Sequence, residues 1–125
     1  VRIGIPTIVG AIRLPNKLNW SHAMELLLLG ETITAERAKE IGLVWEVYPH
    51  EELLEKANEL AQRLCRSAPI ASRVTKEVAT RTKDMGWVEA VRFGETMRIV
   101  ASQTEDAKEG RKAYKEKRNP KWQAR

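Results

Sequence analysis

Apolar side chains recur at helical spacing in the middle of the chain. Between residues 51 and 66 they lie at i, i+3, i+4 and i+7 steps, the period of one face of an α-helix. The members of this stripe are Leu53, Leu54, Ala57, Leu60, Ala61 and Leu64. Pro49 precedes the segment and Ser67-Ala68-Pro69 follows it, so the pattern predicts an amphipathic helix over residues 51–66.

Helical patterns continue to the end of the chain. Pro69 suits the first position of a helix over residues 69–82, because proline there loses no intrahelical hydrogen bond. A further helix is predicted over residues 85–101. Thr104 is placed to cap a last helix over residues 104–117, which Asn119-Pro120 ends.

The first fifty residues have shorter elements. Ser21 is a candidate N-cap for a helix over residues 21–29, and Gly30 follows at its end. Thr34 opens a short helix over residues 34–41, which Gly42 closes. Residues 43–48 are β-type and predict an isolated extended segment.

Alternation at the start of the chain predicts a strand. Residues 1–5 read VRIGI, with apolar side chains at every second position, which is the period of a strand. Pro6 and Gly10 are expected to shape a loop after it.

Composition indicates one helical domain that is neither disordered nor membrane-embedded. The chain has 125 residues, 42% of them hydrophobic and 31% charged, and no apolar run approaches the roughly 20 residues of a membrane span. The single cysteine, Cys65, cannot form an internal disulfide and is expected on the buried face of a helix. With no signal-peptide pattern at the N-terminus, these features predict a cytoplasmic protein, or one of an organelle matrix if eukaryotic.

The net charge of +5 raises the question of an anionic partner. Most basic residues alternate with acids on helices, but residues 111–125 hold seven basic residues and the single acid Glu116. A fraying basic terminus and a phosphate-binding segment both explain this tail. No nucleic-acid-binding motif accompanies it, so no nucleic-acid partner is predicted.

The residues alone define no complete active site. His22 and His50 are far apart in the sequence and have no nearby cysteine, so no metal site is predicted. The carboxylate pairs Glu51-Glu52 and Glu105-Asp106 stand at helix starts, where the helix dipole accounts for them. The glycines are not in phosphate-loop or dinucleotide spacing.

One stretch carries a recognisable signature. Residues 26–47 read LLLLGETITAERAKEIGLVWEV, and RLPNKLNWSHAMELL precedes this stretch. SAPIASRVTKE, TEDAKEGRKAYKEKR and NPKW follow it. In the residues of these motifs and in their spacing, the chain resembles the crotonase family of enoyl-CoA hydratases and isomerases over essentially all its length.

The resemblance is to the second half of that family's fold. It implies a mainly α structure, the C-terminal helical, trimerisation-type region, with a short N-terminal strand from a spiral ββα core that the chain lacks. Residues 1–15 would be the end of the core sheet and an active-site-rim loop, and residues 16–125 the helical C-terminal domain. The family's oxyanion-holding N–H groups and catalytic carboxylates would lie upstream, so no catalytic residue is expected in this segment, which alone is predicted to be inactive.

The resemblance also implies partners and binding residues. The full-length protein would be an enoyl-CoA hydratase/isomerase, a lyase or isomerase, acting on an acyl-CoA without another cofactor, as a trimer or dimer of trimers. Tyr114 matches an aromatic position near the acyl or coenzyme A pocket, and Lys117 a basic residue that reaches a coenzyme A phosphate. Core packing and solvated charge are the respective alternatives.

The pocket rim is expected in the segment PTIVG. Pro6, Thr7, Val9 and Gly10 match a glycine-rich loop of the family, in which a backbone N–H helps to hold the water. Thr7 and Val9 stand where many hydratases have glycine, which leaves hydration, isomerisation and other thioester reactions open.

Two functions from different classes therefore fit the sequence. The chain is part of an acyl-CoA enzyme, supplying oligomer contacts, pocket rim and part of the coenzyme A site, or it is a stand-alone helical association module without catalysis. The four tryptophans are expected to pack between helices or at a subunit interface rather than to stack on bases. Trp45 is expected at an interface or in the substrate pocket.

Overall fold

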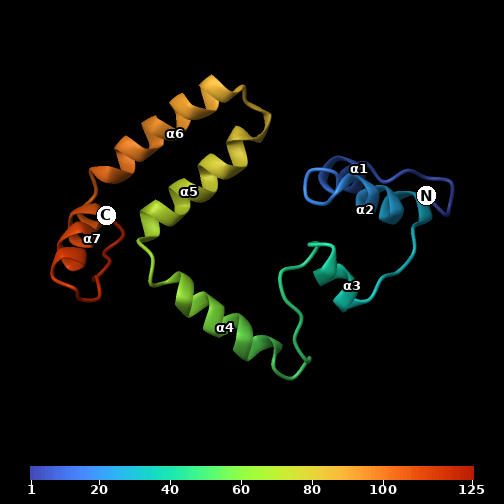
Figure 1. Cartoon of the computed structure of the whole chain (residues 1–125), viewed down its shortest axis with the longest axis horizontal. Helices are drawn as coiled ribbons and strands as arrows, with labels where there is room; N and C mark the ends of the chain where they lie inside the picture. Colours follow the sequence, from blue (N-terminus) through green and yellow to red (C-terminus); the bar gives the residue numbers. More distant parts are fainter. The chain divides into compact units, whose positions relative to one another are not determined.

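The computed structural model describes all 125 residues and divides them into two compact units, Val1–Leu53 and Leu54–Arg125 (Figure 1). Every regular element is helical, and no residue is in a strand. None of the helices combines the length and apolar character needed to cross a bilayer. The mainly α prediction is thus confirmed, whereas the boundary between residues 15 and 16 stays a prediction.

The first unit consists of short helices with side-chain caps. They are α1 (Ile8–Arg13), α2 (Trp20–Met24), the π-helical η1 (Glu25–Leu29) and α3 (Ala35–Glu40). The Thr34 hydroxyl accepts a hydrogen bond from the Arg37 N–H at 3.1 Å, as its predicted N-cap role requires. Gly30 and Gly42 have φ angles of 62° and 78°, so both helix ends use the left-handed conformation that glycine allows.

The start of α2 corrects the cap prediction. Asn19, not Ser21, is the N-cap, because its side chain accepts a hydrogen bond from the Ser21 N–H at 2.9 Å. Ser21 lies within the first turn. The helix then widens into η1, so residues 25–29 are helical as predicted but have π geometry.

The strand predicted over residues 1–5 is absent. The Gly4 N–H donates to the Val1 carbonyl at 3.0 Å, and Gly4 has a φ of 78°, so this segment is a turn. Alternation predicts which face a strand would bury, but a strand also needs a neighbour to accept its hydrogen bonds, and this chain contains none. Residues 43–48 likewise pair with no strand; the N–H groups of Leu43 and Val44 bond to the Ala38 carbonyl at the end of α3.

The second unit carries the longer helices. They are α4 (Leu53–Leu64), α5 (Pro69–Arg81), the 3₁₀ turn η2 (Thr82–Asp84), α6 (Trp87–Ser102) and α7 (Glu105–Lys115). Helices α5 and α6 form an antiparallel pair joined through η2, and α7 follows α6 (Figure 1). Pro69 occupies the first turn of α5, and the Thr104 hydroxyl caps α7 by accepting from the Ala107 N–H at 3.1 Å. Both sequence predictions are confirmed.

Few apolar side chains are buried. The buried set comprises Leu18, Ala23, Ala38 and Ala113, with Asp106 as the buried charged residue. The apolar stripe of α4 is helical as predicted but largely open, with Leu54 at 74% exposure. Cys65, expected on a buried face, is exposed. Helical periodicity identifies a face that can be buried, but it does not supply the surface that covers it.

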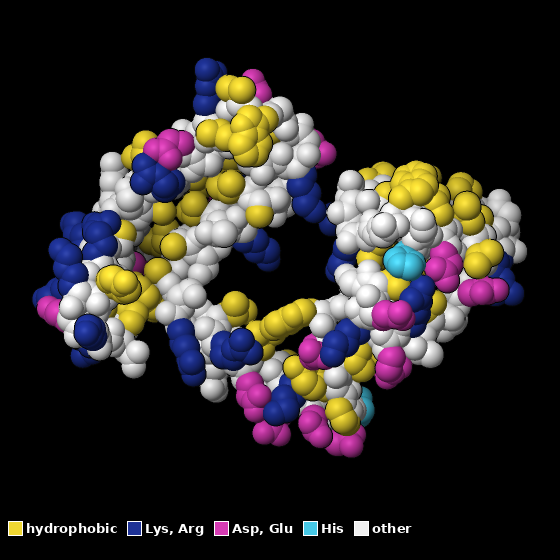
Figure 2. Space-filling model, in the orientation of Figure 1, with side chains coloured by type: hydrophobic (Ala, Val, Ile, Leu, Met, Phe, Trp, Pro, Cys, Tyr) yellow, Lys and Arg dark blue, Asp and Glu magenta, His cyan; other side chains and the backbone are white.

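The open apolar residues of the first unit lead to a prediction of self-association. Val1, Ile3, Ile5, Ile8, Val9, Ile12, Leu28 and Leu29 are all at least half exposed, and hydrophobic side chains lie at the surface over α1 and α2 (Figure 2). Such surface is rarely left in water. We expect the isolated chain to form oligomers at tens of micromolar, measured by light scattering.

A pair of variants tests which surface is responsible. Replacing Ile3 and Ile8 by glutamate should shift the chain toward monomer, whereas glutamate at Leu54, an exposed apolar residue of α4, should have a smaller effect. A compact, well-behaved monomer of the unmodified chain would contradict the prediction.

Candidate functional site

The two predicted coenzyme A-binding residues lie on one turn at the end of α7. The helix ends at Lys115, two residues before the predicted end. The Lys117 N–H donates to the Tyr114 carbonyl at 3.2 Å, and the Arg118 N–H donates to the Ala113 carbonyl at 3.1 Å. These two bonds form a Schellman motif in which Lys117 is the C′ residue. We call residues 116–119 the α7 turn.

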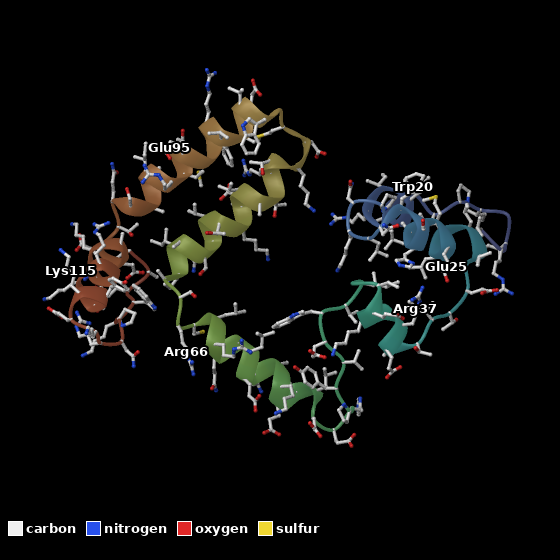
Figure 3. All side chains as sticks on the ribbon, viewed as in Figure 1. Trp20, Glu25, Arg37, Arg66, Glu95 and Lys115 are labelled. Atoms are coloured by element: carbon white, nitrogen blue, oxygen red, sulfur yellow. The ribbon has the colours of Figure 1, made fainter.

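Both candidate side chains are open to a ligand. Tyr114 is 86% exposed, so packing in the core of this chain does not explain it. Lys117 is exposed and its ammonium has no ion-pair partner, while its neighbour Arg118 is paired. Lys115, the last residue of α7, is also exposed (Figure 3). The end of α7 and the α7 turn together therefore present an aromatic ring and an unpaired positive charge.

Arg118 is fixed by two carboxylates. Its guanidinium donates to both oxygens of Glu109, at 2.6 and 3.0 Å, and to Glu116 at 2.6 Å. The Lys121 N–H donates to Glu109 as well, at 2.8 Å. Hydrogen bonds from Arg118 and from this N–H lower the pKa of Glu109 to about 2, and the two carboxylates raise the pKa of Arg118. Both groups are therefore charged near neutral pH.

The residues after the turn fold back onto α7. Asp106, only 1% exposed, accepts hydrogen bonds from the N–H groups of Gln123 and Ala124 at 2.6 and 2.9 Å. The Trp122 indole N–H donates to the Arg66 carbonyl at 2.9 Å, at the junction of α4 and α5 (Figure 3). A Cβ on Gly110 would lie 3.3 Å from the Trp122 ring, so glycine permits this close approach.

Sequence reasoning missed Asp106 and Glu109 as parts of this arrangement. The helix dipole is enough to explain an acidic residue at position 106, in the first turn of a helix. The sequence around Glu109 is that of an ordinary acidic residue on a helix surface. The signals available were the chain reversal at Asn119-Pro120 and the apolar Trp122 beyond it. Neither identifies a carboxylate partner.

The predicted pocket rim has a different local structure. Residues 8–13 form α1, so the expected loop ends at Thr7. The Thr7 hydroxyl caps that helix by accepting from the Gly10 N–H at 3.3 Å. The capping role explains why a threonine is at position 7. It also occupies the Gly10 N–H, which is therefore not free to donate to a ligand at the rim. Pro6 and Val9 are exposed. The rim lies in the compact unit Val1–Leu53 and the α7 turn in the unit Leu54–Arg125.

A second charged cluster links α2 and η1 to α3. Arg37 donates to Glu40 at 2.8 Å and lies 3.6 Å from Glu25, whose carboxylate is also 3.6 Å from His22 (Figure 3). The hydrogen bond from Arg37 lowers the pKa of Glu40. The Arg37–Glu40 pair lies within α3, whereas the contact between Arg37 and Glu25 joins α3 to η1. The cluster therefore has a structural role.

The groove between α5 and α6 is apolar. It has a volume of about 450 Å³ and is lined mainly by Ala71, Val74, Val78, Gly94 and Ala101. Its one charged side chain, Arg98, donates to Glu95 at 2.7 and 2.5 Å. Its lining also includes the hydroxyl of Thr75 but no carboxylate, histidine or cysteine.

Sequence comparison with known proteins places the chain in one protein family. The family model described as enoyl-CoA hydratase/isomerase matches residues 1–125. A protein named "Probable enoyl-CoA hydratase, mitochondrial" from Dictyostelium discoideum is 36% identical over 123 residues, covering 98% of this chain and 44% of that protein. A carnitinyl-CoA dehydratase from Salmonella typhimurium is 37% identical over 125 residues, covering 97% and 48%.

Solved structures agree with the sequence comparison. An enoyl-CoA hydratase/isomerase from Mycobacterium paratuberculosis superposes with a TM-score of 0.92 at 36% identity, covering 99% of this chain and 50% of that one. The chain belongs to the enoyl-CoA hydratase/isomerase family. It spans about half the length of the relatives that it matches.

Proposed function

We propose that this chain is the C-terminal part of an enoyl-CoA hydratase/isomerase-type enzyme that acts on acyl-CoA thioesters. The observation that carries the proposal is a family match over all 125 residues that nevertheless covers about half of each relative. The named relatives are a hydratase and a dehydratase of CoA thioesters, which is why a thioester substrate is chosen.

Within that enzyme, the chain's own residues bind and orient rather than react. Lys117 holds a coenzyme A phosphate, and Tyr114 borders the acyl or coenzyme A pocket. Pro6, Thr7, Val9 and Gly10 form the rim. The groups that hold the oxyanion and move protons are assigned to the half of the enzyme that this chain does not cover. No cofactor is needed, since coenzyme A is part of the substrate.

The exposed apolar surface supports the oligomeric part of the proposal. The open residues of α1 and the stripe of α4 suit contacts with the rest of the enzyme and between its subunits, in a trimer or dimer of trimers. The compartment stays a prediction: the cytoplasm, or an organelle matrix if eukaryotic. One relative is named mitochondrial.

A stand-alone association module is the second candidate, and the same exposed apolar surface favours it. Measuring the intact mass of the natural gene product distinguishes the enzyme from the stand-alone module. The enzyme requires an additional segment of roughly this chain's length, because the chain covers 44% to 50% of its relatives. A mature product of 14.3 kDa would support the module.

The phosphate role of Lys117 gives a kinetic prediction. In the intact gene product, Lys117→Ala should raise the KM for an enoyl-CoA several-fold and leave kcat nearly unchanged. An exposed lysine–phosphate contact contributes only about 1 kcal/mol, and binding lost equally in ground and transition states appears in KM. The measurement is steady-state kinetics on crotonyl-CoA.

A shortened substrate provides the control. Crotonyl-pantetheine lacks the adenosine phosphates, so its KM should not change in the variant. Lys115→Ala, which removes another exposed charge from α7, should affect either substrate less. An equal loss on both substrates in Lys117→Ala would mean that the lysine supports the fold, and the phosphate role would be dropped.

A further inference from the structure

Lys117 occupies a backbone conformation that costs free energy for a lysine. Its φ is 52°, and Ala124 is the only other non-glycine residue with a positive φ. The C′ position of a Schellman motif is normally glycine, because a Cβ is disfavoured in the left-handed region. A side chain retained in such a conformation is held there by its surroundings, and such positions concentrate at functional sites.

Two residues that follow Lys117, Arg118 and Lys121, are hydrogen-bonded to Glu109. This carboxylate accepts both hydrogen bonds of the Arg118 fork and the Lys121 N–H. Arg118 also bonds Glu116 and, at 3.2 Å, the Asn119 carbonyl. The residues on both sides of Lys117 are thus fixed while its own ammonium stays unpaired.

We infer that Glu109 is a positioning residue for coenzyme A binding: by holding Arg118 and the Lys121 N–H, it keeps Lys117 in the left-handed conformation from which its ammonium meets a phosphate. This inference rests on the proposed function of Lys117. Glu109 touches no substrate and acts through the α7 turn.

The rest of the tail has anchors of its own. Asp106 holds the N–H groups of Gln123 and Ala124, and Trp122 bonds the Arg66 carbonyl. Loss of Glu109 should therefore loosen the α7 turn and leave the end of the chain attached. The bidentate geometry also matters, because a lysine at position 118 would keep the charge but could not form the fork.

The test uses Glu109→Gln in the intact gene product, with Glu105→Gln as the matched control. Glu105 lies on the same helix and pairs with Lys108 at 2.6 Å, but it makes no bond to the turn. Glu109→Gln should raise the KM for crotonyl-CoA several-fold, with kcat and the KM for crotonyl-pantetheine unchanged. Arg118→Lys should do the same, and Glu105→Gln should leave both KM values unchanged.

A double-variant cycle separates this inference from the proposed function. If Glu109 acts through Lys117, adding Glu109→Gln to Lys117→Ala should raise the KM for crotonyl-CoA no further. The inference would be overturned if Lys117→Ala raised the KM for crotonyl-CoA alone while Glu109→Gln and Arg118→Lys did not. It would also be overturned if the effects of Lys117→Ala and Glu109→Gln on that KM were additive. Either result would leave the phosphate role of Lys117 intact. No selective loss in Lys117→Ala would overturn the phosphate role itself.

A stability measurement tests the backbone argument without activity. Lys117→Gly should raise Tm by about 2–4 °C, because glycine adopts the left-handed conformation freely, and should still weaken binding of crotonyl-CoA. Lys117→Ala keeps a Cβ and should give no such rise. Equal Tm values for the glycine and alanine variants would overturn the inference.

Discussion

We expect the purified 125-residue chain to hydrate crotonyl-CoA no faster than buffer does. Enzymes typically accelerate their reactions by about 10⁶-fold or more, so the difference in rate between this chain and a complete enzyme is the largest effect predicted. Catalysis would need donors aimed at a developing oxyanion and a free acid or base beside it. In this chain the Gly10 N–H already donates to the Thr7 hydroxyl that caps α1, and Glu25, Glu40 and Glu109 each lie beside an arginine.

The assay follows the loss of the enoyl-thioester absorbance. The intact gene product and a hydratase relative, tested in the same buffer, control for substrate quality. Turnover well above the buffer rate that co-purifies with the chain at constant specific activity would contradict the prediction, and would require a catalytic group within these residues.

Local signals predicted most of the helices. Thr34 and Thr104 cap the helices that they were expected to cap, and Pro69 begins α5. Each of these roles depends on neighbours within four residues, so the sequence contains the whole interaction. Asn19 was missed because Ser21, two residues on, is an equally good capping residue by type.

Roles that depend on distant residues could not be predicted in the same way. A strand over residues 1–5 would need a partner strand, and none is present in this chain. The apolar stripe of α4 likewise needs a covering surface. Asp106 bonds residues 17 and 18 positions away. Its location at a helix start gave a sufficient local reason for an acid, and nothing local indicated that the tail returns.

The binding roles of Tyr114 and Lys117 stay predictions, but their relative placement followed from the sequence. Tyr114 and Lys117 are three residues apart at a helix end, so spacing alone places them on one turn, and the structure does so. The conformation of that turn was not predicted. A glycine usually marks a left-handed C′ residue, and here a lysine held by its neighbours takes that place.

Removing the buried carboxylate of Asp106 should have the largest effect on stability. Asp106→Ala leaves the N–H groups of Gln123 and Ala124 without their acceptor, and Asp106 is only 1% exposed. A hydrogen bond to a charged group contributes about 1.5–3 kcal/mol net, and two such bonds are lost, so we expect the free energy of unfolding to fall by about 2–4 kcal/mol. Urea unfolding followed by circular dichroism measures the loss.

Glu105→Ala is the matched control, because Glu105 and Asp106 both lie in the first turn of α7 and favour its dipole alike. Glu105 is exposed and its ion pair with Lys108 lies on the surface, so its loss should lower the free energy of unfolding much less than the loss of Asp106 does. Amide hydrogen exchange adds a local readout: Gln123 and Ala124 should lose protection in Asp106→Ala and keep it in Glu105→Ala. Equal stability and equal protection in the two variants would show that Asp106 acts through the helix dipole and does not anchor the tail.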